Sequence, residues 1–294
     1  MKKKLLAGVL GLALLLPSQV LANDSYKDLE LPAGKVDLST LPIEFQEILS
    51  KRTDEINNYF DVLQELNFKA ELAKKEVEKQ EKFGVVSMNI LSKFNEVNNK
   101  LEYYDNNSLE IVGLEKIGHE NDSPLMQPFS SKTQAAIDKP TVYYDNDSQS
   151  YVATTNWIWN QANGDIDNTG RDGVGIGVTQ EVLSLFDTHV STWDTRGNKY
   201  WPSKSTEASA HGYHIVFDDN SNGATYTAHK GTSWMFFRFY NAKPVGKLVN
   251  FNSRYDHTWN KVTINGVSIS VSGIGLNFSS GSGWTTTNYS GIRF

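Results

Sequence analysis

The sequence predicts an α+β protein, with an N-terminal helical bundle or coiled-coil region followed by an all-β antiparallel sandwich domain. Three observations predict this order. Residues 43–117 contain no tryptophan and repeat their apolar side chains at helical spacing. Residues 141–294 hold all seven tryptophans and alternate apolar with polar side chains, as strands do. The stretch between them is polar, contains three prolines and shows no period. We therefore divide the chain into a signal peptide at 1–22, a helical domain at 23–117, a linker at 118–140 and the β-sandwich at 141–294.

The first 22 residues have the pattern of an export signal. Three lysines at positions 2–4 precede the apolar stretch Leu5–Leu16, and small residues end the segment at Ala22. An uncleaved membrane anchor needs about 20 apolar residues, whereas Pro17 ends this stretch earlier. We expect cleavage after Ala22 and a secreted, extracellular product.

Composition restricts the classes of partner. The chain contains no cysteine, so its stability has to come from burial without disulfides. Loss of the three signal lysines changes the formal charge from −6 to −9, and both halves hold more acidic than basic residues. Nucleic acid is excluded as a partner because phosphate binding needs clustered Lys and Arg. Adsorption to an anionic membrane by charge alone is disfavoured for the same reason.

The helical domain is predicted to form two or three antiparallel helices. Pro42 suits a first turn, the run 69–82 is strongly helix-forming, and Gly84 is expected to separate two helices. A heptad-like seam, interrupted by Arg52, predicts a bundle or stalk. The alternative is a pro-segment that covers the β domain until it is removed. The seam consists of Phe45, Leu49, Ile56, Tyr59, Leu63 and Leu66.

Beyond Pro140 the apolar period changes to that of strands. Runs of four to seven residues, rich in aromatic and β-branched side chains, are separated by turn-forming residues. Asn222-Gly223 and Asn265-Gly266 are typical hairpin turns. Eight or more short strands without an intervening helical pattern predict an antiparallel sandwich or barrel of about 150 residues.

Five aromatic residues form the predicted ligand-binding site. Trp157 and Trp159 are two apart on a predicted strand, so both rings leave the same face of the sheet. Trp193, Tyr200 and Trp201 lie in loop-like sequence, where large rings are typically exposed. An indole face with polar neighbours suits a sugar ring. The alternative is that these rings fill the β core, as aromatic residues commonly do.

The segment 163–173 concentrates side-chain oxygens in a glycine-rich loop, which is the environment that a hard cation needs. The EF-hand spacing fails, because Ile176 stands where that motif requires Glu. Two interpretations stay open. Asp165, Asp167 and Asp172 are calcium ligands in one, and in the other they belong to a plain turn cluster, which the composition favours. No other cofactor is expected.

No catalytic residue is assigned. The six histidines fall in no zinc-binding spacing, and neither a cysteine nucleophile nor a GxSxG elbow is present in the sequence. An enzyme is therefore the less favoured class. A hydrolase with two carboxylates far apart in the chain is the third hypothesis.

The predicted function is a secreted binding protein whose β-sandwich recognises a glycan or cell-envelope surface through exposed aromatic residues. The alternative is a secreted, membrane-active pore-forming toxin. It rests on Val267, Ile269 and Val271, which alternate with serines as in strands that line a pore. A membrane is a partner only under that alternative.

Overall fold

The structure is a computed structural model that describes residues 26, 29–82, 86–106, 112–117, 135–159, 171–202, 204–219, 221–222, 225–258, 264–278 and 283–294. In this part of the chain, apart from the two-residue strand β1 (Gly34–Lys35), two α-helices precede strands that form mostly antiparallel sheets, which confirms the predicted order of elements at this level. The predicted signal peptide lies outside the described residues. Among the helices of the described part, we find none with the length and apolar character needed to cross a membrane.

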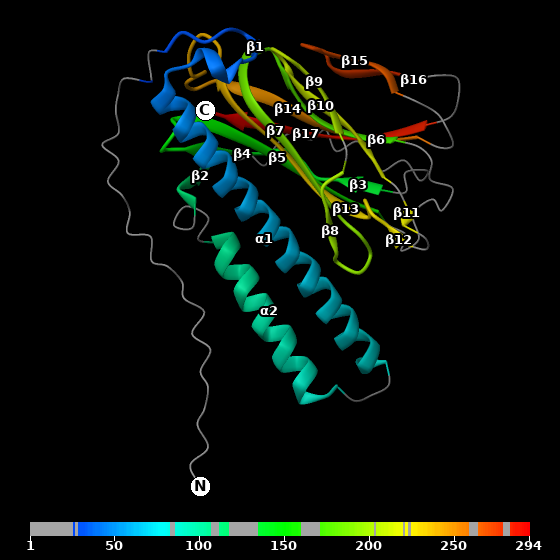
Figure 1. Ribbon diagram of the computed structural model, residues 1–294. Helices are drawn as coiled ribbons and strands as arrows, with labels where there is room; N and C mark the ends of the chain where they lie inside the picture. Colours follow the sequence, from blue (N-terminus) through cyan, green and yellow to red (C-terminus); the bar gives the residue numbers. More distant parts are fainter. Residues whose placement is uncertain are drawn as a thin grey trace.

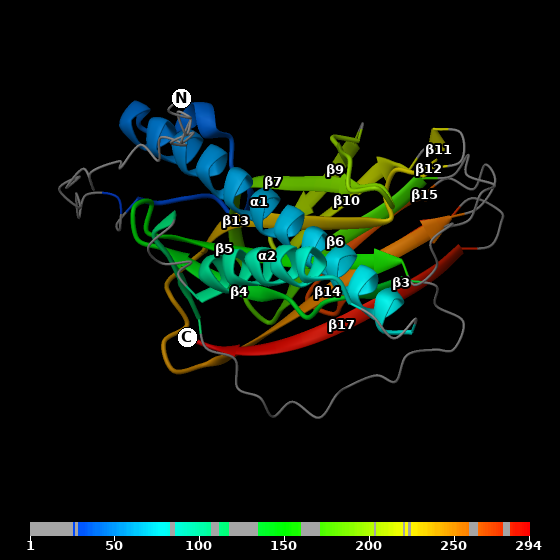
Figure 2. The same cartoon turned by 90° about the horizontal axis from the view of Figure 1, so that it is seen from below.

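The two helices lie side by side (Figure 1). Helix α1 (Ile43–Glu81) begins after Pro42 and runs for 39 residues without a break, and α2 (Met88–Asn106) follows it. Both lie across one face of the larger sheet (Figure 2). The apolar seam of α1 packs on strands of that sheet, because Phe45, Leu49 and Ile56 share a buried cluster with its outward-facing side chains.

The larger sheet has the strand order β1-β7-β13-β5-β4-β2, with β3 paired to β5 and β8 paired to β7. Only the pair of β1 and β7 among the described ladders of this sheet is parallel. Its strands are β1 (Gly34–Lys35), β2 (Leu114–Lys116), β3 (Ala135–Ile137), β4 (Thr141–Asp145), β5 (Ser150–Trp159), β7 (Leu183–Trp193), β8 (Lys199–Tyr200) and β13 (Lys230–Phe239).

The smaller sheet has the antiparallel order β17-β14-β6-β10-β9. Two further strand pairs, β11 with β12 and β15 with β16, form separate two-stranded sheets. The strands are β6 (Arg171–Thr179), β9 (Lys204–Ser209), β10 (Gly212–Asp218), β11 (Ser221–Asn222), β12 (Thr225–Tyr226), β14 (Leu248–Thr258), β15 (Ile264–Ser270), β16 (Gly273–Phe278) and β17 (Gly283–Arg293).

The core between the two sheets is strongly aromatic. Side chains from both sheets meet there in one buried cluster, which includes Trp157, Trp159, Tyr213, Phe217, Phe237, Phe251 and Tyr255. These rings account for much of the aromatic excess of residues 141–294.

The helical segment and the β strands share a sheet as well as a core. Residues 34–35 and 114–116, from the predicted helical domain, and residues 135–137, from the predicted linker, are all strands of the larger sheet. Trp234 and Phe236 of β13 are fully buried in the cluster that the apolar seam of α1 completes. Removal of the helices would therefore expose a large apolar face.

One predicted turn is wrong. Asn265-Gly266 lies inside β15 at an irregularity of its pairing with β16, and the two strands are joined at residues 271–272. Gly273, with φ +116°, provides the backbone conformation that this connection needs. An Asn-Gly pair also suits a bulge, and local sequence does not separate the two uses.

His189 of β7 makes stability depend on pH. Its ring stacks on Trp234, with centroids 5.8 Å apart. Burial, followed by the charges of Lys204 and Lys199, lowers the pKa of His189 to about 3, from about 6.5 in an unfolded chain. Below pH 6.5 His189 therefore binds a proton in the unfolded state but not in the folded state. The free energy of unfolding consequently falls as the pH falls toward 3.

Because of His189, we expect the free energy of unfolding to fall by about 2 kcal/mol between pH 7 and pH 5. Denaturant unfolding of the wild type and of His189→Gln at both pH values measures it. Other titrating groups are common to the two proteins, so the variant should lose about 2 kcal/mol less than the wild type. Equal losses would contradict the assignment.

Candidate functional site

Three of the five predicted ligand-binding residues are buried. Trp157, Trp159 and Trp193 are each at most 2% exposed. Trp157 packs between Phe217 and Tyr255 of the smaller sheet. The two rings of β5 do leave the same face, but the second sheet covers that face. These three tryptophans therefore do not form the outward stacking surface that the sequence predicted.

Tyr200 ends β8, which follows the loop after β7, and Trp201 comes directly after Tyr200. Trp201 is 71% exposed, and the Lys199 ammonium lies 4.7 Å from its ring centroid. The carboxylate of Asp194 accepts hydrogen bonds from two backbone amides of the loop and from the Tyr200 hydroxyl. Lys199 also pairs with Asp61 of α1. Trp201 is thus the one predicted tryptophan that presents its ring to solvent in the described structure.

A larger candidate site is an open cavity at one end of the larger sheet. Its volume is about 920 Å³, and it is lined by three parts of the chain. These are the segment 29–32, the end of β4 with the turn into β5, and residues 238–243 after the centre of β13. None of these segments was assigned to a site from the sequence.

The cavity has an aromatic lining, which we call the aromatic cavity. Tyr144, Tyr151, Phe239 and Tyr240 all contribute to it. The rings of Tyr144 and Tyr151 are 5.0 Å apart, and those of Tyr151 and Phe239 are 5.4 Å apart. Tyr240 is 43% exposed at the surface. The Lys243 ammonium lies 5.8 Å from the ring centroid of Tyr144.

Gln149 supplies a polar group to the same cavity. Its Oε1 atom is buried and has no hydrogen-bond partner in the described structure. Its φ of +53° lies in the left-handed region, which is uncommon for residues other than glycine. A buried acceptor without a partner costs about 1–3 kcal/mol. A ligand with a suitably placed donor would recover that cost.

Arg238 forms part of the cavity wall and is held in place by three acceptors. Its Nη1 donates to the Tyr26 carbonyl at 2.7 Å, its Nη2 to the Ser148 carbonyl at 2.6 Å, and its Nε to the Ser150 hydroxyl at 3.1 Å. Burial lowers the pKa of Arg238 to about 10, which leaves it charged at neutral pH. The cavity therefore carries a fixed positive charge in its wall.

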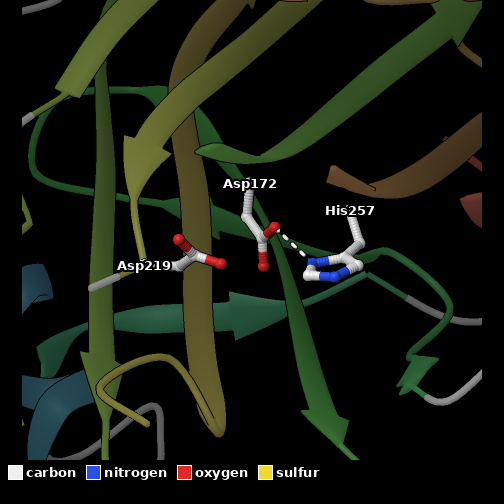
Figure 3. Close-up of side chains that lie close together, drawn as sticks. All are labelled: Asp172, Asp219 and His257. Carbon is white, nitrogen blue, oxygen red and sulfur yellow. Dashed lines mark hydrogen bonds and ion pairs between the residues drawn. The ribbon is translucent and has the colours of Figure 1, made fainter. Parts of the chain in front are cut away.

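A second cluster lies at the end of the smaller sheet. Asp172 of β6, a predicted calcium ligand, lies with Asp219 and His257 (Figure 3). All three residues are completely buried, and one potential ligand atom from each lies within 4.8 Å of the others. The other two predicted ligands, Asp165 and Asp167, lie outside the described residues. Neither Asp219 nor His257 was assigned to a metal from the sequence.

Hydrogen bonds hold Asp172 in position, whereas the carboxylate of Asp219 has none among the described residues. Asp172 Oδ1 is 2.7 Å from His257 Nδ1, and the Tyr255 hydroxyl donates to Asp172 Oδ2. Neither carboxylate oxygen of Asp219 has a hydrogen-bond partner in the described structure. Burial, and then the charge of Asp172, raises the pKa of Asp219 far above its usual range.

Comparison with known proteins gives little beyond a general likeness. No protein-family model and no curated protein matches the chain. A collagen-binding domain from a Staphylococcus aureus adhesin is similar at 11% identity and a TM-score of 0.28, over 54% of this chain and 98% of that one. ACE19, the collagen-binding subdomain of the Enterococcus faecalis surface protein ACE, is similar at 9% identity and a TM-score of 0.25, over 49% and 88%. TM-scores this low carry no functional argument.

Proposed function

We propose that this chain is an exported binding protein that recognises a cell-envelope glycan through the aromatic cavity. The observation that carries the proposal is the cavity itself, in which four aromatic rings line a volume of about 920 Å³ together with polar side chains. Ligand sites are commonly cavities of about 300–1,000 Å³ with aromatic walls and a few polar groups. The cavity differs from the site predicted from the sequence, because its rings are three tyrosines and one phenylalanine and none of the five predicted residues lines it.

The lining suits a sugar in two respects. Partly exposed rings such as Tyr240 offer flat apolar faces against which the C–H groups of a sugar ring can stack. Gln149 offers a buried acceptor without a partner, and Asn241 and Lys243 add polar groups at the rim. A sugar hydroxyl is a donor that reaches such an acceptor at little cost.

The lining favours binding over hydrolysis. Glycosidic bond cleavage ordinarily uses two carboxylates on either side of the bond. Among the described residues that line the cavity, Glu30 is the sole carboxylate. A recognition site needs no such pair.

Replacement of Tyr240 by alanine tests the proposal. Tyr240 is 43% exposed, so the variant should fold normally. Retention on insoluble envelope polysaccharide, measured as an apparent Kd, should weaken about tenfold, which corresponds to about 1.4 kcal/mol. Trp201→Ala is the matched control, because that ring is exposed but does not line the cavity.

The two variants separate the possible recognition surfaces. Weakened retention of Trp201→Ala with unchanged retention of Tyr240→Ala would place recognition at the loop that the sequence predicted. Failure of the wild type to bind any envelope polysaccharide would exclude glycan recognition.

A membrane-active toxin is the second candidate. It is favoured by β15 and β16, which pair with each other and with no strand of the two large sheets in the described structure. Val271, at their connection, is 52% exposed. Release of dye from liposomes by the wild type, without retention on polysaccharide, would replace the binding function with this one.

A further inference from the structure

We propose that Asp172, Asp219 and His257 form a binding site for one divalent metal ion of the zinc or manganese class. The site is separate from the aromatic cavity, and it does not depend on glycan binding. It retains one of the three ligands predicted from the sequence and adds two that lie far along the chain.

Strand register places the three side chains on one face of the smaller sheet. Asp172 pairs directly with Phe217 of β10, and Asp219 follows two residues later on the same side. Gly173 pairs with Asp256 of β14, so His257 comes opposite Asp172. The three therefore converge at the end of the inner face, beyond the apolar core.

The negative charge of the two carboxylates favours binding of a cation. Two completely buried carboxylates face one another, with the carboxylate of Asp219 directed toward Asp172 in Figure 3. The arginines next to the cluster along the strands do not supply the missing charge. Arg171 pairs with Asp218, and Arg254 pairs with Asp256.

A buried carboxylate without a partner is very unfavourable, and burial of this kind is ordinarily accompanied by pairing or by a metal ion. Asp219 is the decisive residue, because it is completely buried and both of its oxygens are without hydrogen-bond partners in the described structure. Its carboxylate is directed toward Asp172 in the cluster (Figure 3).

The ligand types select the metal. An imidazole nitrogen with two carboxylate oxygens suits zinc or manganese, whereas calcium is ordinarily held by six to eight oxygens. Ligand atoms about 2.1 Å from one ion lie at most about 4.2 Å apart. The observed atoms lie within 4.8 Å, so a small side-chain movement closes the site.

Neighbouring hydrogen bonds hold one ligand in position. The Tyr255 hydroxyl donates to Asp172, and Trp159 Nε1 donates in turn to the Tyr255 hydroxyl at 3.1 Å. Groups behind the ligands of metal sites commonly orient them in this way. Complete burial indicates a structural ion, which would tie β10, β6 and β14 together at one end.

The test begins with the full mature chain, unfolded in the presence of a chelator and refolded with ZnCl2, MnCl2 or CaCl2. Elemental analysis after removal of free metal should find one equivalent of zinc or manganese per chain. The refolded metal-bound protein should melt about 5–10 °C above the metal-free protein. Absence of bound zinc and manganese, or no change in the melting temperature, would overturn the proposal.

The Asp219→Asn variant distinguishes two explanations of the cluster, a bound metal ion and a proton shared by the carboxylates of Asp172 and Asp219. A metal site predicts that this variant loses the bound equivalent and the metal-dependent rise in melting temperature. Asp218→Asn, one residue away and paired with Arg171 outside the cluster, should keep both. A shared proton predicts a metal-free wild type and an Asp219→Asn variant of equal or higher melting temperature, because the amide resembles the protonated acid. That result would overturn the proposal, and the wild-type metal content decides it even if the variant fails to fold.

Discussion

Arg52→Ala is expected to lower the free energy of unfolding by about 3–5 kcal/mol, because it leaves a buried carboxylate without its cation. Arg52 of α1 is 4% exposed and Asp145 at the end of β4 is completely buried. The guanidinium reaches both carboxylate oxygens, with Nη2 2.8 Å from Oδ1 and Nε 3.2 Å from Oδ2. It also donates to the Val112 carbonyl. One side chain thus joins the helix, the segment before β2 and the end of β4.

Denaturant unfolding followed by circular dichroism measures this effect as a shift of the midpoint at constant slope. Lys51→Ala is the matched control, because Lys51 is the preceding residue of the same helix and its side chain is 64% exposed in a surface pair with Glu55. That control should stay within about 0.5 kcal/mol of the wild type. A loss below about 1 kcal/mol in Arg52→Ala would mean that Asp145 is not held as a charged partner.

Arg52 also illustrates what the sequence was able to predict about the helices. Helical period and propensity are local, and they identified the long first helix and the apolar seam beside Arg52. The partner of that arginine is Asp145, 93 residues away. Local spacing predicts that a seam needs a covering surface, but it does not say whether another helix or a sheet provides it.

The tryptophans of the β domain show the same limit of local sequence. Alternation correctly placed Trp157 and Trp159 on one face, because side-chain direction in a strand depends only on neighbouring residues. Whether that face is covered depends on the smaller sheet, whose residues lie later in the chain. Asn156, the residue before Trp157, accepts a hydrogen bond from Gln64 of α1 on the other side of the sheet.

The candidate metal ligands divide in the same way. Asp172 was found because side-chain oxygens are dense in the local sequence. Asp219 and His257 join it through the register of three neighbouring strands. Register is a property of the assembled sheet, so no spacing motif reports it.

Trp157→Ala is expected to cost about 3–5 kcal/mol, which is typical of removing a large ring from a core. The ring is 2% exposed, and it lies so close to the backbone of β13 that Gly231 has no room for a Cβ. Trp201→Ala removes the same side chain at a site that is 71% exposed, and it should change stability by less than about 0.5 kcal/mol. Denaturant unfolding of both variants, with acrylamide quenching of the wild type, makes the comparison.

The stabilities of Trp157→Ala and Trp201→Ala determine how a loss of binding in either variant is interpreted. A tryptophan that stacks on a ligand is costly for binding and nearly neutral for folding, whereas a core tryptophan is costly for folding and affects binding only through the folded fraction. Reduced retention of Trp157→Ala would therefore count as recognition only if its stability matched that of the wild type. Equal stability of the two tryptophan variants would mean that Trp157 faces outward, and it would return the recognition surface to β5.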